Sequence, residues 1–92
     1  MNKYETIFII NAANEETKIK ELIEKFSSII NSNGKVESVD EWGKKRLAYP
    51  IAKQSEGYYV LINFDAKPEL IAELERVYKI TDEILKFITV RK

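Results

Sequence analysis

The sequence predicts an α+β fold in which a four-stranded antiparallel sheet carries two helices on one of its faces. Two stretches have apolar residues at helical 3/4 spacing, and four have strand patterns, in the order β-α-β-β-α-β. Two right-handed crossover connections then put both helices on the same side of the sheet. The 92 residues are too few for two separate cores, so we expect a single domain over residues 1–92.

The first strand is predicted over KYETIFII, residues 3–10, where alternate residues share a face. Asn14 is expected to cap the helix that follows, and Asn33-Gly34 to end it. One apolar stripe of this helix repeats at the 3/4 spacing of a buried face. Its members are Ile19, Leu22, Ile23, Phe26, Ile29 and Ile30.

Residues 35–49 are predicted to form a long, irregular strand with a bulge or bend. Val36, Val39 and Trp42 are spaced by three instead of two, and Gly43 follows directly. Pro50 cannot donate to a strand ladder, which favours an edge position or the end of pairing.

The second half repeats the pattern of strand, helix and strand. GYYVLINFD, residues 57–65, is a strongly alternating strand, and Pro68 suits the first position of the next helix. Thr81-Asp82 is expected to end that helix. ILKFITVR, residues 84–91, is the last strand, but both of its faces are apolar and its core side stays unassigned.

This element order predicts a ferredoxin-like layout, with the first and third strands in the centre of the sheet. The face away from the helices would then carry Ile7 and Ile9 beside Tyr59 and Leu61. A contiguous apolar patch of this kind predicts a docking surface for another protein. The alternatives are that the patch is small or that these residues face the core.

The composition excludes several classes of function. The chain has no cysteine and no histidine, which excludes disulfides, thiolate metal sites and histidine acid–base catalysis. No apolar run approaches the roughly 18 residues of a membrane span, so a cytoplasmic location is expected. We predict no catalytic residues, no metal site and no cofactor.

The charges balance in total but are unevenly distributed. Fifteen bases face fifteen acids, yet Lys44, Lys45, Arg46 and Lys53 occupy a stretch without any acid. Cations beside aromatic rings such as Trp42 favour contact with RNA, through phosphates and unpaired bases. The alternative is that these lysines protect a sheet edge against aggregation.

The stretch DEWGKKRLAYPIAK, with KYETIFII before it and EGYYVLINF after it, resembles the family of bacterial small-subunit ribosomal protein six. The resemblance runs from Met1 to about Arg91 and implies the same fold without catalytic activity. It also implies a place in the platform of the small subunit. There the family binds 16S ribosomal RNA as a heterodimer with ribosomal protein eighteen.

The resemblance also implies which residues contact RNA. Lys3 takes the place of a usual arginine contact that falls on Asn2, and Lys86 replaces a usual arginine in the last strand. The alternative for Tyr49 is packing beside Pro50, and for Lys86 an ordinary edge lysine. The implied RNA-binding residues are Lys3, Lys44, Lys45, Arg46, Tyr49, Lys53, Lys86 and Arg91.

Two other functions fit the same fold. An acylphosphatase-like enzyme needs an arginine cradle before a helix, whereas Arg46 stands on an edge strand. A ligand-sensing or protein-interaction module outside the ribosome would dimerise through its open sheet face. A stable homodimer would favour that module, and a monomer the ribosomal interpretation.

Overall fold

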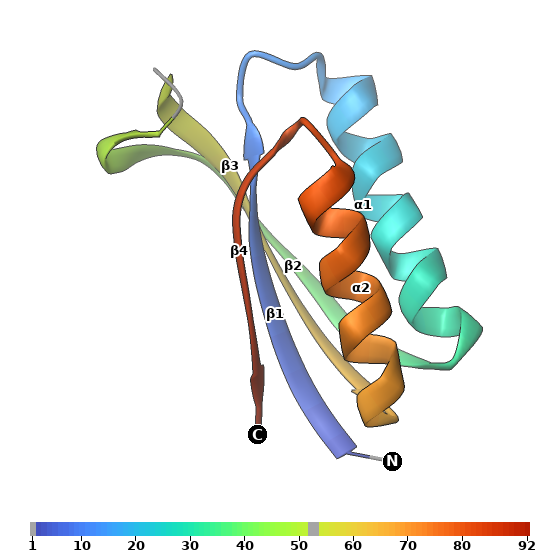
Figure 1. The fold of residues 1–92 in the computed structure, drawn as a ribbon. Coiled ribbons are helices and arrows are strands. Elements are labelled where there is room, and N and C mark those ends of the chain that lie inside the picture. The colour runs from blue at the N-terminus through green and yellow to red at the C-terminus, as the bar shows by residue number, and fades with distance from the viewer. Residues whose placement is uncertain (1, 52–53) are drawn as a thin grey trace.

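Four antiparallel strands form one sheet in the order β2-β3-β1-β4, and both helices pack on the same face of it (Figure 1). The computed structural model describes residues 2–51 and 54–92, and the side chains of residues 2–46 and 56–92. The elements are β1 (Asn2–Asn11), α1 (Glu16–Ser32), β2 (Gly34–Ile51), β3 (Gln54–Ala66), α2 (Pro68–Ile80) and β4 (Ile84–Arg91). The predicted ferredoxin-like architecture, with β1 and β3 in the centre, is confirmed.

The register between β1 and β3 assigns every central residue to a face. It runs without a break from Asn2 opposite Ala66 to Asn11 opposite Gly57. Residues directly opposite each other in an antiparallel pair project on the same side. Phe8 and Val60 therefore face the helices together, while Ile7 and Leu61 face away.

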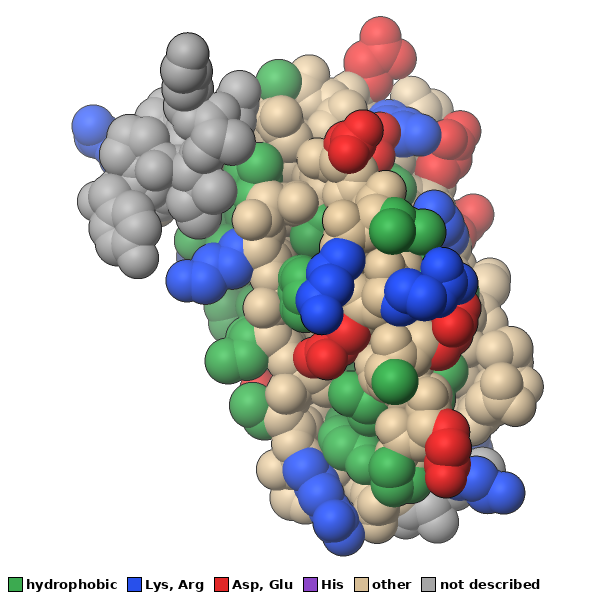
Figure 2. All heavy atoms as spheres, viewed as in Figure 1, with side chains coloured by type: hydrophobic (Ala, Val, Ile, Leu, Met, Phe, Trp, Pro, Cys, Tyr) green, Lys and Arg blue, Asp and Glu red, His purple; other side chains and the backbone are tan. Residues whose placement is uncertain are grey.

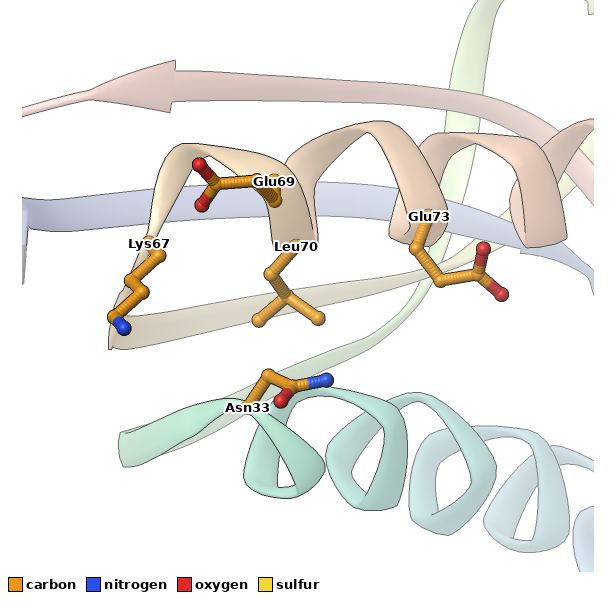
Figure 3. Close-up of a pocket in the computed structure, with 5 residues that line it drawn as sticks. All are labelled: Asn33, Lys67, Glu69, Leu70 and Glu73. Carbon is orange, nitrogen blue, oxygen red and sulfur yellow. The ribbon is translucent and has the colours of Figure 1, made fainter.

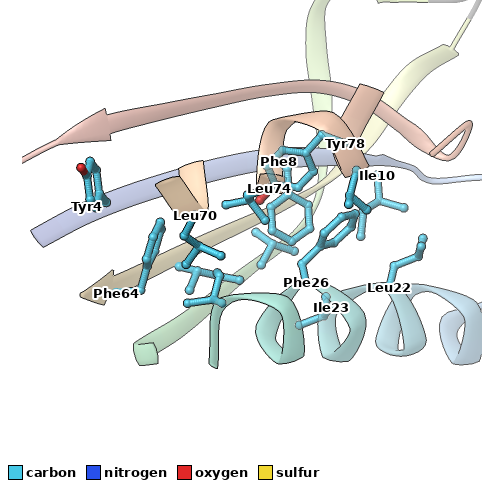
Figure 4. Packing of buried hydrophobic residues seen from close by; sticks show 14 of the residues in the cluster. Tyr4, Phe8, Ile10, Leu22, Ile23, Phe26, Phe64, Leu70, Leu74 and Tyr78 are labelled. Carbon is cyan, nitrogen blue, oxygen red and sulfur yellow. The ribbon is translucent and has the colours of Figure 1, made fainter. Parts of the chain in front are cut away.

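The core lies between the sheet and the two helices, and the rings of Phe8, Phe26 and Tyr78 pack together within it (Figure 4). Phe26 of α1 and Tyr78 of α2 have ring centroids 4.6 Å apart, and Phe8 of β1 lies 5.1 and 5.3 Å from them. Phe87 of β4 stacks on Tyr78 at 5.0 Å. The predicted helix stripes face this core, with Ile29 and Ile71 at its margin.

The core side of β4, which the sequence leaves open, follows from its pairing with β1. Phe87 is opposite Phe8 and Thr89 is opposite Thr6, so both project toward the helices. Lys86 and Ile88 alternate with them and project away.

β2 contains the predicted irregularity. Its register with β3 shifts between Val36 and Ser38 and again between Glu41 and Gly43. Each shift adds a residue that breaks strict alternation. Gly43 has φ 81°, a left-handed conformation that suits glycine. The first bulge puts Val36 and Val39 on the same face of the sheet despite their three-residue spacing, whereas Trp42 lies on the other face against Tyr59.

The predicted cap at Asn14 is wrong. α1 begins at Glu16 with Glu15 as the residue before it, and no side chain caps the first turn. Asn14 instead donates through Nδ2 to the carbonyl of Asn11 at 2.9 Å, which closes the turn after β1. The other helix limits are confirmed, with Pro68 at the start of α2 and Thr81 after its last residue.

No helix among the described residues is long and apolar enough to cross a membrane.

A chain of hydroxyl groups links α2, β1 and β4 inside the core. The hydroxyl of Thr6 lies 3.1 Å from that of Tyr78 and 3.0 Å from that of Thr89. Burial raises the pKa of Tyr78 well above its usual value of 10.0, and the bond to Thr6 offsets this only in part.

We therefore predict that stability falls at alkaline pH and that Tyr78→Phe reduces this fall. The folded protein keeps Tyr78 neutral, whereas the unfolded chain releases its proton above about pH 10, so stability present below that pH is lost as pH rises. Tyr78→Phe should cost about 1 kcal/mol at neutral pH for the lost hydrogen bond. It should also lower the alkaline slope by up to about 1.4 kcal/mol per pH unit. Urea denaturation between pH 7 and 11.5 measures both, and an unchanged slope would contradict the assignment.

Candidate functional site

The sheet face away from the helices, which we call the open face, has an apolar centre. Ile7 is opposite Leu61 and Ile9 is opposite Tyr59, so the four residues predicted for protein docking do share this face. Ile9 is buried by its neighbours, and the other three are half-buried. Their placement agrees with the sequence prediction, and their role in docking stays a prediction.

Three further apolar side chains extend this centre, and the sequence analysis did not assign them to it. Ile88 and Val90 of β4 are 56% and 45% exposed, and Trp42 of β2 is 42% exposed. Trp42 stacks on Tyr59 with ring centroids 6.3 Å apart, and its indole N–H donates to Asp40 at 3.0 Å. The two β4 residues become predictable only once the register with β1 is known.

A shallow hollow of about 230 Å³ opens in this apolar centre beside β4. Residues from three adjacent strands form its walls. They are Ile7, Ile9, Tyr59, Lys86, Phe87 and Ile88. The hollow has room for an apolar side chain of a partner, which is how well-packed protein interfaces gain much of their affinity.

One end of the open face is occupied by ion pairs. Lys3 lies 2.8 Å from Glu37 and 3.7 Å from Asp65, and Lys92 lies 3.4 Å from Glu5. The hydrogen bond from Lys3 lowers the pKa of Glu37, and the same bond raises the pKa of Lys3. Lys3, predicted to contact RNA, is therefore already placed against two acids.

Arg91, another predicted RNA residue, lies at this same end but not on the open face. It is opposite Tyr4, on the helix side of the sheet, and donates to the Oδ1 of Asn2 at 3.1 Å. Tyr4 itself is buried in the core.

The other end of the sheet carries the three consecutive cations, which we call the basic tip. In the pairing with β3, Lys44 is opposite Tyr58, Lys45 is opposite Gly57, and Arg46 is opposite Glu56. All three side chains are exposed. In the described part of the chain, no ion pair joins any of them to an acid. Their charges are available to an outside anion.

Neighbouring cations of the tip point to opposite faces of the hairpin. Lys44 lies on the helix side, where it borders a hollow of about 300 Å³ with Asn14, Glu16, Ile19 and Tyr58. Lys45, the next residue, projects to the open face. Tyr58 donates to Glu41 at 2.9 Å, and burial together with this bond raises the pKa of Tyr58.

The predicted RNA residues are therefore spread over the molecule. Lys3 lies eight positions along β1 from the row of Lys45, which is about 27 Å at about 3.4 Å per residue. Lys86 lies in the row of Ile9, near the level of the tip, but at the opposite edge of the sheet. Three strand spacings separate it from β2, or about 14 Å.

Two predicted RNA residues cannot be placed. The backbone of Tyr49 continues β2, but its side chain is outside the described residues. Lys53 also lies outside them.

The helix side differs in charge from the basic tip. Figure 2 shows acidic side chains around the N-terminal half of α1, a stretch that contains Glu15, Glu16, Glu21 and Glu24. A hollow of about 210 Å³ lies between the end of α1 and the start of α2 (Figure 3). The hollow is lined by Asn33, Lys67, Glu69, Leu70 and Glu73.

In the described part of the chain, no group of three or more acidic side chains is arranged to hold a metal ion.

Comparisons with known proteins agree with this fold over almost the whole chain. The family model for "Ribosomal protein S6" matches residues 3–91. The chain is 56% identical over 93 residues to small ribosomal subunit protein bS6 of Clostridium perfringens (strain SM101 / Type A), covering 100% of this chain and 98% of the relative. It is 55% identical over 91 residues to the bS6 protein of Clostridium novyi (strain NT), covering 98% and 96%.

A solved structure gives the same result for the fold. The crystal structure of 30S ribosomal protein S6 from Thermotoga maritima matches with a TM-score of 0.95 and 34% sequence identity. The match covers 99% of this chain and 87% of the other. The chain therefore belongs to the ribosomal protein S6 family and is a structural component of the small ribosomal subunit, not an enzyme.

Proposed function

We propose that this protein binds the central domain of 16S ribosomal RNA together with ribosomal protein eighteen, and so supports assembly of the platform and translation. The observation that carries the proposal is the separation of two surfaces on one sheet. An apolar centre lies on the open face, and an unpaired basic tip lies beyond it. An apolar surface suits a protein partner, and exposed cations suit phosphates.

The basic tip suits a phosphate backbone for two reasons. Lys44, Lys45 and Arg46 keep no acid partner among the described residues, so binding a phosphate breaks no ion pair there. The hairpin of β2 and β3 also extends past the helices, which leaves both of its sides open (Figure 1). A strand of RNA passing this end can meet Lys44 on one side and Lys45 on the other.

The tip alone supplies little affinity. Three phosphate contacts give a salt slope of only about −2 to −3, which corresponds to weak binding at physiological salt. The chain as a whole has no net charge to add to this attraction. A partner protein that binds both the open face and the RNA would supply the missing contacts, so the two surfaces are proposed to act together.

The structure supports RNA contact unequally for the other residues that the family resemblance implies. Tyr49 and Lys53 continue the sequence of the tip and stay predictions for RNA contact. Lys3 and Arg91 lie at the far end of the sheet beside Glu37 and Asn2, so they would need a second stretch of RNA. Lys86 stands at the opposite edge from the tip. The RNA proposal therefore depends mainly on the three consecutive cations.

Replacing the tip should weaken RNA binding and its salt dependence together. We expect the triple variant Lys44→Ala, Lys45→Ala, Arg46→Ala to lower the salt slope by about 2 to 3, because three phosphate contacts are lost. The measurement is a filter-binding titration of a central-domain 16S RNA fragment in the presence of ribosomal protein eighteen at several salt concentrations.

The control removes three exposed lysines from the helices, as Lys20→Ala, Lys25→Ala, Lys79→Ala. It changes the net charge by the same amount and should leave the slope nearly unchanged. Equal losses for both triple variants would show that only total charge matters and would contradict a defined RNA-binding tip.

A charge on the open face should prevent docking of the partner protein. Leu61→Glu puts a carboxylate in the apolar centre, and we expect at least about a 30-fold loss of affinity for ribosomal protein eighteen, about 2 kcal/mol as for a central interface residue. Isothermal titration calorimetry measures the loss, and circular dichroism checks the fold. Ile80→Glu is the control, since Ile80 is apolar and 65% exposed on α2. Unchanged affinity for Leu61→Glu, or an equal loss for both variants, would refute docking on the open face.

A further inference from the structure

We propose that the outer edge of β4 accepts an extended, acidic segment of another polypeptide as a fifth strand of the sheet. β4 is an end strand, paired with β1 on one side only within the described sheet. An unpaired strand edge presents a row of backbone donors and acceptors, and proteins commonly use such an edge to bind extended segments. This inference does not depend on the RNA contacts proposed above.

The backbone groups available at this edge follow from one hydrogen bond. The N–H of Lys92 donates to the carbonyl of Lys3 at 2.9 Å, so residue 92 points its backbone groups toward β1. In an antiparallel pair, successive residues alternate between inward and outward backbone groups. Phe87, Thr89 and Arg91 therefore direct their N–H and C=O groups outward, where an added strand can bond to them.

The two edges of the sheet differ in their readiness to pair. β2 has three register shifts along its described pairing with β3, and the left-handed Gly43 lies at the second. Bulges of this kind discourage the addition of another strand. β4 instead keeps an unbroken register with β1 from Arg91 to Lys86. A further strand is therefore accommodated more readily beside β4.

β4 also leaves apolar side chains for an added strand to cover. Ile88 and Val90 are the exposed apolar residues of this strand on the open face. Figure 2 shows hydrophobic side chains along the margin of the molecule on the β4 side. The hollow of about 230 Å³ adjoins the same strand at Lys86 and Ile88. Apolar side chains at alternate positions of an added strand would pack here.

The charges of β4 favour an added strand that carries acidic side chains. Residues 84–91 contain Lys86 and Arg91 and no acid. Lys86 has no ion pair among the described residues, and Arg91 bonds only the neutral amide of Asn2 there. A second copy of this chain would bring two more cations to the seam, whereas carboxylates would pair with those present. Lys86 would then bind a carboxylate instead of the phosphate that the sequence resemblance implies.

The test uses an extended ten-residue peptide with glutamate at the position beside Lys86 and valine at the positions beside Ile88 and Val90, titrated into the ¹⁵N-labelled protein to millimolar concentration. We expect the amide shifts to concentrate in β4, with the largest at the outward amides of Phe87 and Thr89. Lys86→Glu should weaken binding about fivefold through the lost ion pair. Lys35→Glu, an exposed lysine on the β2 edge, is the matched control and should leave the affinity unchanged.

Two further peptides separate strand pairing from general attraction. A fully N-methylated version of the same peptide cannot donate backbone hydrogen bonds and should not bind. The same peptide with lysine in place of glutamate should bind at least fivefold more weakly. Shifts centred on β2 or the helices, no shift at all, or equal binding of the N-methylated peptide would overturn the proposal. So would β4 shifts caused by an RNA oligonucleotide alone, or by self-association of the protein without peptide.

Discussion

The unbroken pairing of β1 with β3 is the constraint from which the rest of the structure follows. It fixes Phe8 and Val60 on one side of the sheet and Ile7 and Leu61 on the other. A slip of one residue would exchange the two faces of one strand and place Ile7 or Leu61 toward the helices. Both crossovers are right-handed, so both helices cover the same side. The open face is therefore a direct consequence of the pairing that forms the core.

This arrangement separates stability from function. The aromatic cluster of Phe8, Phe26, Tyr78 and Phe87 and the hydroxyl chain through Thr6 lie between the helices and the sheet. The open face and the basic tip contribute few of these contacts. Substitutions on those two surfaces can therefore alter binding with little effect on folding. Conversely, substitutions in the core should alter stability first.

The charges are distributed to match this separation. At one end of the open face, Lys3 and Lys92 are held against Glu37, Asp65 and Glu5. At the other end, the tip keeps its cations without acid partners in the described part of the chain. The zero net charge of the chain therefore conceals an uneven distribution. The tip offers an RNA backbone three neighbouring cations that have no acid partner among the described residues.

Much of the fold could be predicted from the sequence because its information is local. Alternation in KYETIFII and GYYVLINFD and the 3/4 stripes of the two helices assign most core residues correctly. The faces of β4 could not be assigned, because both are apolar and only pairing with Phe8 places Phe87 inside. The cap at Asn14 was predicted wrongly because its side chain closes the turn after Asn11 instead.

The site was less predictable, because its geometry depends on contacts between distant residues. The bulge before Gly43 decides which of Lys44 and Lys45 points to the helix side and which to the open face. The ion pair between Lys3 and Glu37 joins residues on different strands, and no sequence pattern indicates it. The family resemblance supplied RNA-contact candidates, but it did not show that they are spread over both ends of the sheet.

If one sheet presents a protein-binding face and a separate RNA-binding tip, site-specific photocrosslinking in assembled small subunits should distinguish the two surfaces. A photoreactive residue replaces Lys45, Leu61 or Ile80 in turn. We expect crosslinks from position 45 to ribosomal RNA and from position 61 to a protein, with no specific product from position 80. RNA crosslinks from position 61, or only protein crosslinks from position 45, would contradict this expectation.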